Sequence, residues 1–179
     1  MSLALIALVL GCVAGLAMGG KFANLRRMSL GKVRLLLAGA FCEFAGDRWV
    51  SGWAGAVVVV AGFLLLFGFA VRNIKLTGMV LVAAGLLSNL TVVALDGGMP
   101  VRGVPAGVTS GPRHHGEKPG DHLIGLADVV HIAPLGEMVS AGDIVLAVGV
   151  ATVIAGLMRP ARRETATADG APRAQPWTT

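Results

Sequence analysis

The chain has 179 residues, of which 55% are hydrophobic and only 14% are charged, and its mean hydropathy is +0.76. A soluble domain carries about 25% charged residues, so this chain lacks the polar surface that would keep it dissolved. The net charge is +5, but the basic residues lie in short segments between apolar runs, which favours a role in membrane orientation over nucleic-acid binding. We therefore expect an all-α integral membrane protein whose surroundings are the lipid bilayer, with no nucleic-acid partner.

Five apolar stretches approach the length of about 20 residues that a helix needs to cross the hydrocarbon core. They predict membrane spans over residues 2–20, 33–48, 52–71, 76–95 and 140–158. The second span is interrupted by Glu43, and the fifth reaches a sufficient length only if residues 138–143 supply its first turn. The sequence thus predicts a bundle of about five helices within a transmembrane domain of residues 1–158.

The basic residues predict the orientation of this bundle. If the N-terminus lies outside, 11 of the 15 Lys and Arg residues fall on the inner side, as the positive-inside rule requires. We expect a multi-pass protein of the cell membrane with its N-terminus out and C-terminus in. The long loop 96–139 is then extracytoplasmic, and within it Leu123–Ile132 is apolar enough for a short interfacial helix. The tail 159–179 lacks apolar periodicity and is expected to be disordered in the cytoplasm.

Ionisable side chains within membrane spans are costly and indicate function. Glu43, Asp96 and Asp143 would lie at a similar outer depth, so we expect them to be catalytic, with Asn89 binding a ligand beside them. Structural alternatives remain open. Ser140 and Asp143 have the spacing of a helix N-terminal cap, and Asp96 is followed by two glycines that suit a helix end. Asn89 could hydrogen-bond a neighbouring helix, and Glu43 is the hardest to explain structurally.

The histidines and cysteines of the chain could bind a metal or form a disulfide, but their spacing does not match a known site of either kind. The potential zinc ligands are His114, His115, Asp121, His122 and His131. They do not follow a recognised ligand spacing. The two cysteines lie inside apolar runs and are expected to be small buried side chains. We expect no metal and no cofactor.

Four segments resemble motifs of a bacterial membrane protein family catalogued as domain of unknown function 5317. Gly19–Leu25 is similar to the family motif Gly-Gly-basic-x-x-Asn-Leu, and Asp96–Val101 is similar to the motif Asn-Gly-Gly-x-Met-Pro. Ala127–Val129 and Ser140–Asp143 are similar to two later motifs of the Gly-Asp type. The resemblance covers nearly the whole chain up to about Met158 and implies no activity. It singles out Asn24, Gly97, Gly98 and Asp128, which we expect to contribute to ligand binding. Asp96 stands where the family usually has Asn.

A fainter resemblance is to lipoprotein signal peptidases, which are membrane aspartyl proteases. Gly85–Leu90 resembles their Gly-Asn-x-x-Asp-Arg segment, and Ser140–Gly149 resembles the segment that opens their last helix. This implies that Asp143 corresponds to one catalytic aspartate. Val92 occupies the place of the other, and an aspartyl dyad needs two close carboxylates. Asp96 would have to replace the missing one.

These observations leave three hypotheses for function. The leading one is an outer-leaflet polar site that binds or processes an amphipathic, lipid-like ligand. The first alternative is a structural or accessory subunit that packs with a membrane-protein partner, and the second is a signal-peptidase-like protease. A short distance between the carboxyl groups of Asp96 and Asp143 across a cavity would favour an enzyme, whereas carboxyl groups that point apart would not.

Overall fold

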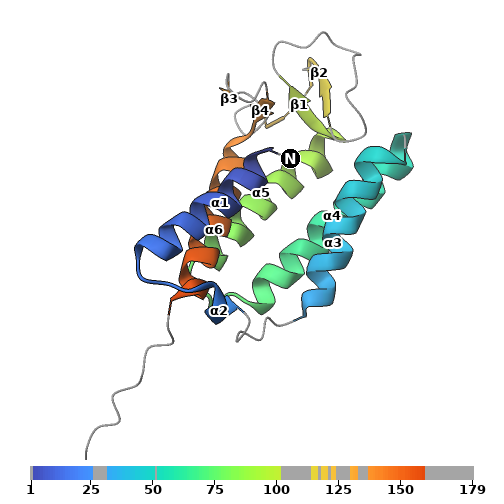
Figure 1. The fold of residues 1–179 in the computed structure, drawn as a ribbon. Helices are drawn as coiled ribbons and strands as arrows, with labels where there is room; N and C mark the ends of the chain where they lie inside the picture. The colour runs from blue at the N-terminus through green and yellow to red at the C-terminus, as the bar shows by residue number, and fades with distance from the viewer. Residues whose placement is uncertain are drawn as a thin grey trace, which may run out of the picture.

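The computed structural model describes residues 2–25, 32–50, 52–101, 114–116, 118–120, 122–123, 130–132 and 137–159. The helices of these segments are α1 (Ser2–Ala17), α2 (Phe22–Leu25), α3 (Val33–Arg48), α4 (Gly52–Arg72), α5 (Met79–Asp96) and α6 (Ala141–Met158). The strands are β1 (Met99–Val101), β2 (His114–Gly116), β3 (Val130–Ile132) and β4 (Glu137–Val139). Figure 1 shows the long helices side by side, with the strands gathered at one end.

Each predicted span contains one long helix. The main difference lies before α5, which begins at Met79 rather than at residue 76, because residues 73–78 form the turn that follows α4. Gly78 ends this turn with a φ of 90°, a left-handed conformation that glycine adopts without steric cost. The one-turn helix α2 was not predicted.

Three helices of the described chain are long and apolar enough to cross a membrane. They are α4, with 21 residues, and α5 and α6, with 18 residues each. At 1.5 Å per residue these lengths correspond to roughly 27–31 Å, close to the thickness of the hydrocarbon core. The helix α1 is apolar but has only 16 residues. The helix α3 also has 16 residues and contains two acidic and two basic side chains. The structure therefore supports a membrane protein, while five spans and the orientation stay predictions.

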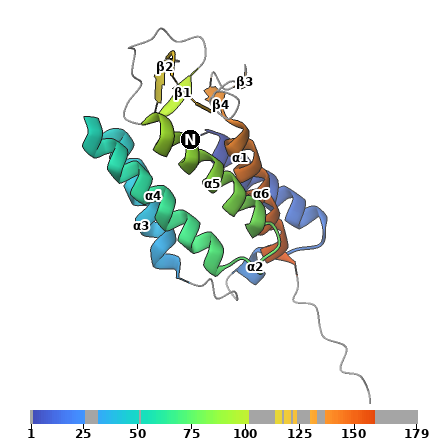
Figure 2. The same ribbon diagram turned by 180° about the vertical axis from the view of Figure 1, so that it is seen from behind.

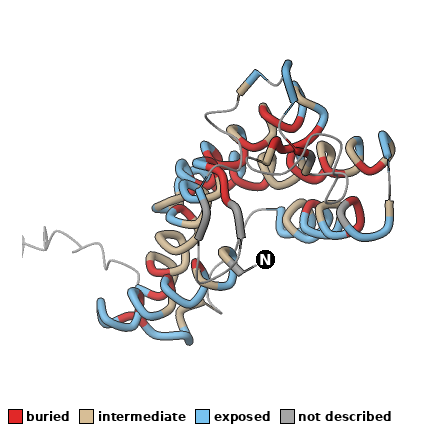
Figure 3. The backbone as a smooth tube through the Cα atoms, turned by 90° about the horizontal axis from the view of Figure 1, so that it is seen from above, coloured by how far each residue is buried: buried red, intermediate tan, exposed pale blue. Residues whose placement is uncertain are grey.

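The long helices pack in the order α3, α4, α5, α6, α1, each against its neighbours in this row. Figure 2 shows the same row from behind, with α5 in its middle. In the view from above, the buried parts of the chain lie mainly where helices face one another (Figure 3). The helices α1 and α3 occupy the ends of the row and bury only narrow stripes of small residues, such as Ala7, Gly11 and Gly15 on α1.

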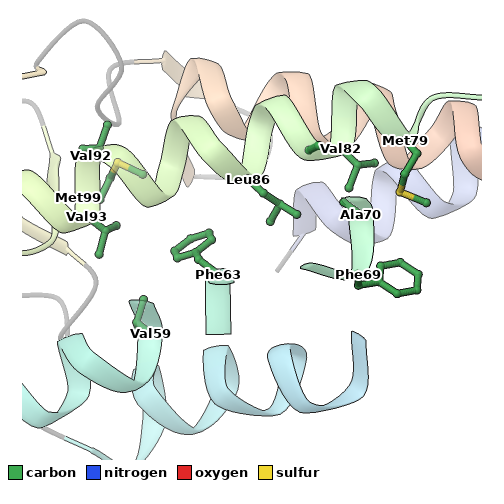
Figure 4. Packing of buried hydrophobic residues seen from close by; sticks show 11 residues of the cluster. Val59, Phe63, Phe69, Ala70, Met79, Val82, Leu86, Val92, Val93 and Met99 are labelled. Carbon is green, nitrogen blue, oxygen red and sulfur yellow. The ribbon is translucent and has the colours of Figure 1, made fainter. Parts of the chain in front are cut away.

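The hydrophobic core lies between α4 and α5. Val59 and Phe63 point from α4 toward Leu86 and Val93 of α5 (Figure 4). Met99, directly beyond α5, joins the same cluster. These residues hold the middle of the row together through apolar contacts.

Much of the remaining apolar surface is exposed. The exposed fraction is 61% for Leu5, 65% for Leu37 and 82% for Trp53. Soluble monomers rarely present apolar surface on this scale, whereas lipid tails cover such side chains favourably. The exposed helix surface thus agrees with the hydropathy of the sequence.

The connection between α5 and α6 contains short strands that the sequence analysis did not predict. Strand β1 pairs in parallel with β2, and β3 pairs antiparallel with β4. The predicted interfacial helix over Leu123–Ile132 is wrong at residues 130–132, which form β3, and its other residues after Leu123 lie outside the described chain. The expected first turn over 138–143 is also wrong at its start, because Met138 and Val139 belong to β4 and α6 begins at Ala141.

The two ends of the bundle differ, and we name them for what they carry. The loop end comprises the C-termini of α3 and α5, the N-termini of α4 and α6, and the described residues between α5 and α6 (Figure 1). The basic end comprises α2, the start of α3, the α4–α5 turn and the end of α6. The loop end holds Asn89, Asp96 and Asp143 among the candidate functional residues, whereas Asn24 lies at the basic end.

Candidate functional site

Three polar side chains join α5 to α6 near the loop end. Asn89 donates a hydrogen bond from Nδ2 to Oδ1 of Asp143 at 2.7 Å. The Ser140 hydroxyl donates to Oδ1 of Asn89 at 3.1 Å and accepts from the backbone N–H of Asp143 at 2.9 Å. The backbone N–H of Ser140 donates to Oδ2 of Asp143 at 3.2 Å. We call this set of hydrogen bonds the α5–α6 network.

Local sequence explains half of this network. Ser140 has extended backbone angles (φ −86°, ψ 163°) and, with Asp143 three residues later, forms a reciprocal capping box at the start of α6. Such a cap satisfies backbone N–H groups that the first turn of a helix leaves open. The capping alternative for Asp143 is therefore confirmed, and Asn89 adds a second helix to it.

Close approach of the two helices completes the network. A Cβ atom placed on Gly142 would collide with Oδ1 of Asn89, and one placed on Gly85 would lie 2.7 Å from the carbonyl oxygen of Gly142. Glycines at these positions allow the backbones to approach closely enough for side chains to bond across the interface. The network therefore depends on the shape of the interface as well as on its polar atoms.

The network is closed. Asn89 is 1% exposed and Ser140 is fully buried. Asp143 is half-buried, and each of its carboxylate oxygens already accepts a hydrogen bond. Buried polar groups in a membrane protein require such partners. The structure thus brings together two of the predicted site residues, Asn89 and Asp143, in an arrangement that joins helices.

Asp96, the last residue of α5, has a different partner. Its Oδ1 accepts a hydrogen bond from the backbone N–H of His122 at 3.0 Å and lies 3.1 Å from Nδ1 of the His122 ring. Asp96 follows Asn89 by seven residues, or about 10 Å of helix. The carboxyl groups of Asp96 and Asp143 therefore interact with different groups, and the geometry does not favour an aspartyl dyad.

The loop conformation beyond α5 positions Asp96. Gly97 takes the left-handed conformation with φ 68° and ends α5, as the sequence alternative proposed. The buried Gly98 then leads into β1. The predicted ligand residues Gly97 and Gly98 thus shape the backbone that holds Asp96 beneath the loop.

The Asp96–His122 pair combines a buried carboxylate with an exposed ring. The side chain of Asp96 is 0% exposed, whereas that of His122 is 73% exposed. A carboxylate that accepts from one ring nitrogen fixes the tautomer and orientation of the imidazole and leaves the other nitrogen available. Nε2 of His122 can then form a hydrogen bond with a group outside the bundle.

Glu43 lies at another interface. A Cβ atom on Gly62 of α4 would lie 2.7 Å from Oε1 of Glu43, so the carboxyl group packs against the backbone of α4. Since α4 separates α3 from α5 in the row, Glu43 does not share an interface with Asn89 and Asp143.

Asn24 lies at the opposite end of the molecule. Its Nδ2 donates to the carbonyl oxygen of Met158 at 2.8 Å, and the backbone N–H of Lys21 donates to the same oxygen at 2.8 Å. These bonds satisfy a carbonyl group at the C-terminus of α6. The motif Gly19–Leu25 thereby joins α2 to α6, away from the loop end. Asp128 lies outside the described residues.

Within the described residues, no three His, Cys, Asp or Glu side chains gather as a metal site would require. His114 is half-buried in β2, and both cysteines, Cys12 and Cys42, are free thiols. Asp121 and the side chains of His115 and His131 lie outside the described chain. Among these histidines, His122 is paired with Asp96 in the structure. The sequence did not predict this pairing.

Comparison with known families agrees with the motif analysis. The profile of the family of unknown function DUF5317 matches residues 23–155. The chain belongs to this family. The DUF5317 match includes Asn24, Asn89, Asp96, His122 and Asp143, so the α5–α6 network and the Asp96–His122 pair both lie within the family's domain. Neither a curated protein nor a solved structure matches the chain, and the resemblance to signal peptidases gains no support.

Proposed function

We propose that this DUF5317 protein binds the polar head of an amphipathic, lipid-like ligand at the loop end, through the Asp96–His122 pair. The observation that carries the proposal is the burial of the Asp96 carboxylate beneath an exposed His122 ring. The carboxylate orients the ring, and the ring presents its free nitrogen to the surroundings.

The surroundings of this pair suit an amphipathic molecule. Leu95, the residue before Asp96, is 58% exposed on α5, and Leu87 two turns earlier is 48% exposed. A ligand whose head hydrogen-bonds His122 could therefore lay its apolar tail along the helix surface, where it would replace lipid. Ligand sites commonly combine an apolar lining with a few polar groups.

We propose binding only. The catalytic role of Asp96, Asp143 and Glu43 is still a prediction. Asp143 is poorly suited to catalysis, because both its oxygens already accept hydrogen bonds from Asn89 and Ser140. Val92, in the position of a second catalytic aspartate, is fully buried among apolar residues. These facts argue against a peptidase.

The test compares the lipids retained by the full-length protein after purification in mild detergent. Wild type, Asp96→Ala, His122→Ala and the control Arg48→Gln are extracted, and their lipids are identified by mass spectrometry. We expect at least one amphipathic species to be enriched over the bulk membrane in wild type and Arg48→Gln and lost from both site variants. Equal retention by all four proteins, or no enrichment in wild type, would overturn the proposal.

A structural or accessory subunit is the second candidate. Two observations favour it. Asn89, Ser140 and Asp143 join α5 to α6, and Asn24 joins α2 to α6. These polar residues bond the helices to one another, and the exposed helix surface could then contact a partner protein. The measurement is the mass of the particle extracted from native membranes, where this candidate predicts a defined complex larger than the chain itself.

A further inference from the structure

Six exposed Lys and Arg side chains of the described chain lie at the basic end. They are Lys21, Lys32, Arg34, Arg72, Lys75 and Arg159. The described segments of this end, residues 18–25, 32–36, 70–78 and 155–159, contain no Asp or Glu. The acidic residues Asp96 and Asp143 lie at the loop end instead, so charge is strongly divided along the molecule.

Packing brings these cations together from distant parts of the sequence. A Cβ on Gly68 of α4 would lie 3.8 Å from Cδ1 of Leu35, so the first turn of α3, with Arg34, lies beside the last turn of α4, with Arg72. Figure 1 shows the start of α3 and the end of α4 at the same end of the bundle. Lys32 and Lys75 flank these turns.

The end of α6 joins the same surface. A Cβ on Gly156 would lie 3.6 Å from Cβ of Thr77, which places the α4–α5 turn beside the last turn of α6. The N–H of Lys21 donates to the carbonyl of Met158, so Lys21 and Arg159 are neighbours. The positive charges thus surround the ends of packed apolar helices.

Helix dipoles account for only part of this distribution. A cation in the last turn of a helix, such as Arg72, interacts favourably with the negative end of the dipole. Lys32 and Arg34 lie instead at the start of α3, where a positive charge is unfavourable. An external anion would relieve this repulsion and that among neighbouring cations.

Exposed apolar side chains lie directly beside the cations. Val33, Val71 and Ile74 are 39%, 47% and 41% exposed, and Phe22 is 54% exposed. We propose that the basic end binds anionic phospholipid, with the phosphate among the cations and the acyl chains along α3 and α4. A phospholipid matches both halves of this surface, since basic clusters at helix ends attract anionic head groups.

The experiment measures lipid binding by native mass spectrometry of the full-length protein in detergent. The probes are phosphatidylglycerol and phosphatidylcholine with the same acyl chains. The test variant is Lys32→Gln/Arg34→Gln, because removing cations from the start of a helix should not weaken that helix. The matched control is Arg48→Gln/Lys118→Gln, which removes two charges at the loop end, and Lys32→Arg/Arg34→Lys keeps the charges in place. Circular dichroism confirms that all variants are folded.

We expect wild type to prefer phosphatidylglycerol. At about fivefold for each cation near the lipid surface, the test variant should bind it about 25-fold more weakly. The control and the charge-keeping variant should bind as wild type does. Equal binding of the two lipids, an equal loss in the control, or displacement of phosphatidylglycerol by millimolar inorganic phosphate would each overturn the proposal, the last by indicating a site for free phosphate.

Discussion

Two polar sites on the same helix, α5, behave in opposite ways. Asn89 lies 1% exposed in a closed network with Ser140 and Asp143, whereas Asp96, two turns later, holds a His122 ring that is 73% exposed. Asn89 and Asp96 are both polar residues in an otherwise apolar stretch, and the sequence does not distinguish between them. The two sites differ in that the hydrogen bonds of Asn89 are made within the bundle, whereas the Asp96 partner is an exposed ring.

The largest expected effect comes from Gly142→Ala in the closed network. The added Cβ would collide with Oδ1 of Asn89, so the side chain must move and the bonds to Ser140 and Asp143 must stretch or break. Overpacking and loss of the network together should lower the free energy of unfolding by about 2–3 kcal/mol. The measurement is equilibrium unfolding in detergent.

The matched control for this change is Gly156→Ala on the same helix. There the added Cβ would meet Cβ of Thr77 at 3.6 Å, an ordinary contact distance. Gly156→Ala should leave stability unchanged or raise it slightly, since alanine favours helix. Equal destabilisation by both substitutions would mean that α6 is merely sensitive to any methyl group.

A smaller effect is expected from Asn89→Ala. It leaves Oδ1 of Asp143 and the Ser140 hydroxyl without their Asn89 partner, which should cost about 1–2 kcal/mol, near the upper part of the range for hydrogen bonds between membrane helices. Thr91→Ala is the comparison, because the Thr91 hydroxyl bonds the Leu87 carbonyl within α5. If both variants unfold alike, Asn89 does not join the helices.

His122→Ala should have the smallest effect on stability, below about 0.5 kcal/mol, because the ring is exposed and the backbone N–H of residue 122 still reaches Asp96. If His122→Ala destabilised the protein as much as Asn89→Ala does, the Asp96–His122 pair would be a structural contact. It would then not differ in role from the α5–α6 network.

Much of the helical part of the fold could be predicted from the sequence. Apolar length located α1, α4, α5 and α6, and the spacing of Ser140 and Asp143 identified the cap of α6, because both signals are local. The charged helix α3 was predicted from the orientation that its neighbouring spans require. The partners of these residues were not predictable. Asp96 meets His122 across 26 positions, and β1 pairs with β2 through only three residues on each strand, so neither contact leaves a periodic signal.

The predicted convergence of Glu43, Asn89, Asp96 and Asp143 illustrates this limit. Depth along a span can be estimated from sequence, but the helix that a side chain faces depends on the packing order. Because α4 lies between α3 and α5, Glu43 contacts Gly62 and shares no interface with Asn89. Only Asn89 and Asp143 were brought together.

The most direct test of the contrast between the two sites is thiol labelling of His122→Cys and Asn89→Cys. Both are made in a Cys12→Ala/Cys42→Ala background, and the purified full-length proteins react with a charged maleimide in detergent. The account predicts rapid labelling at position 122 and almost none at position 89 while the protein is folded. Labelling at similar rates, whether both fast or both slow, would contradict it.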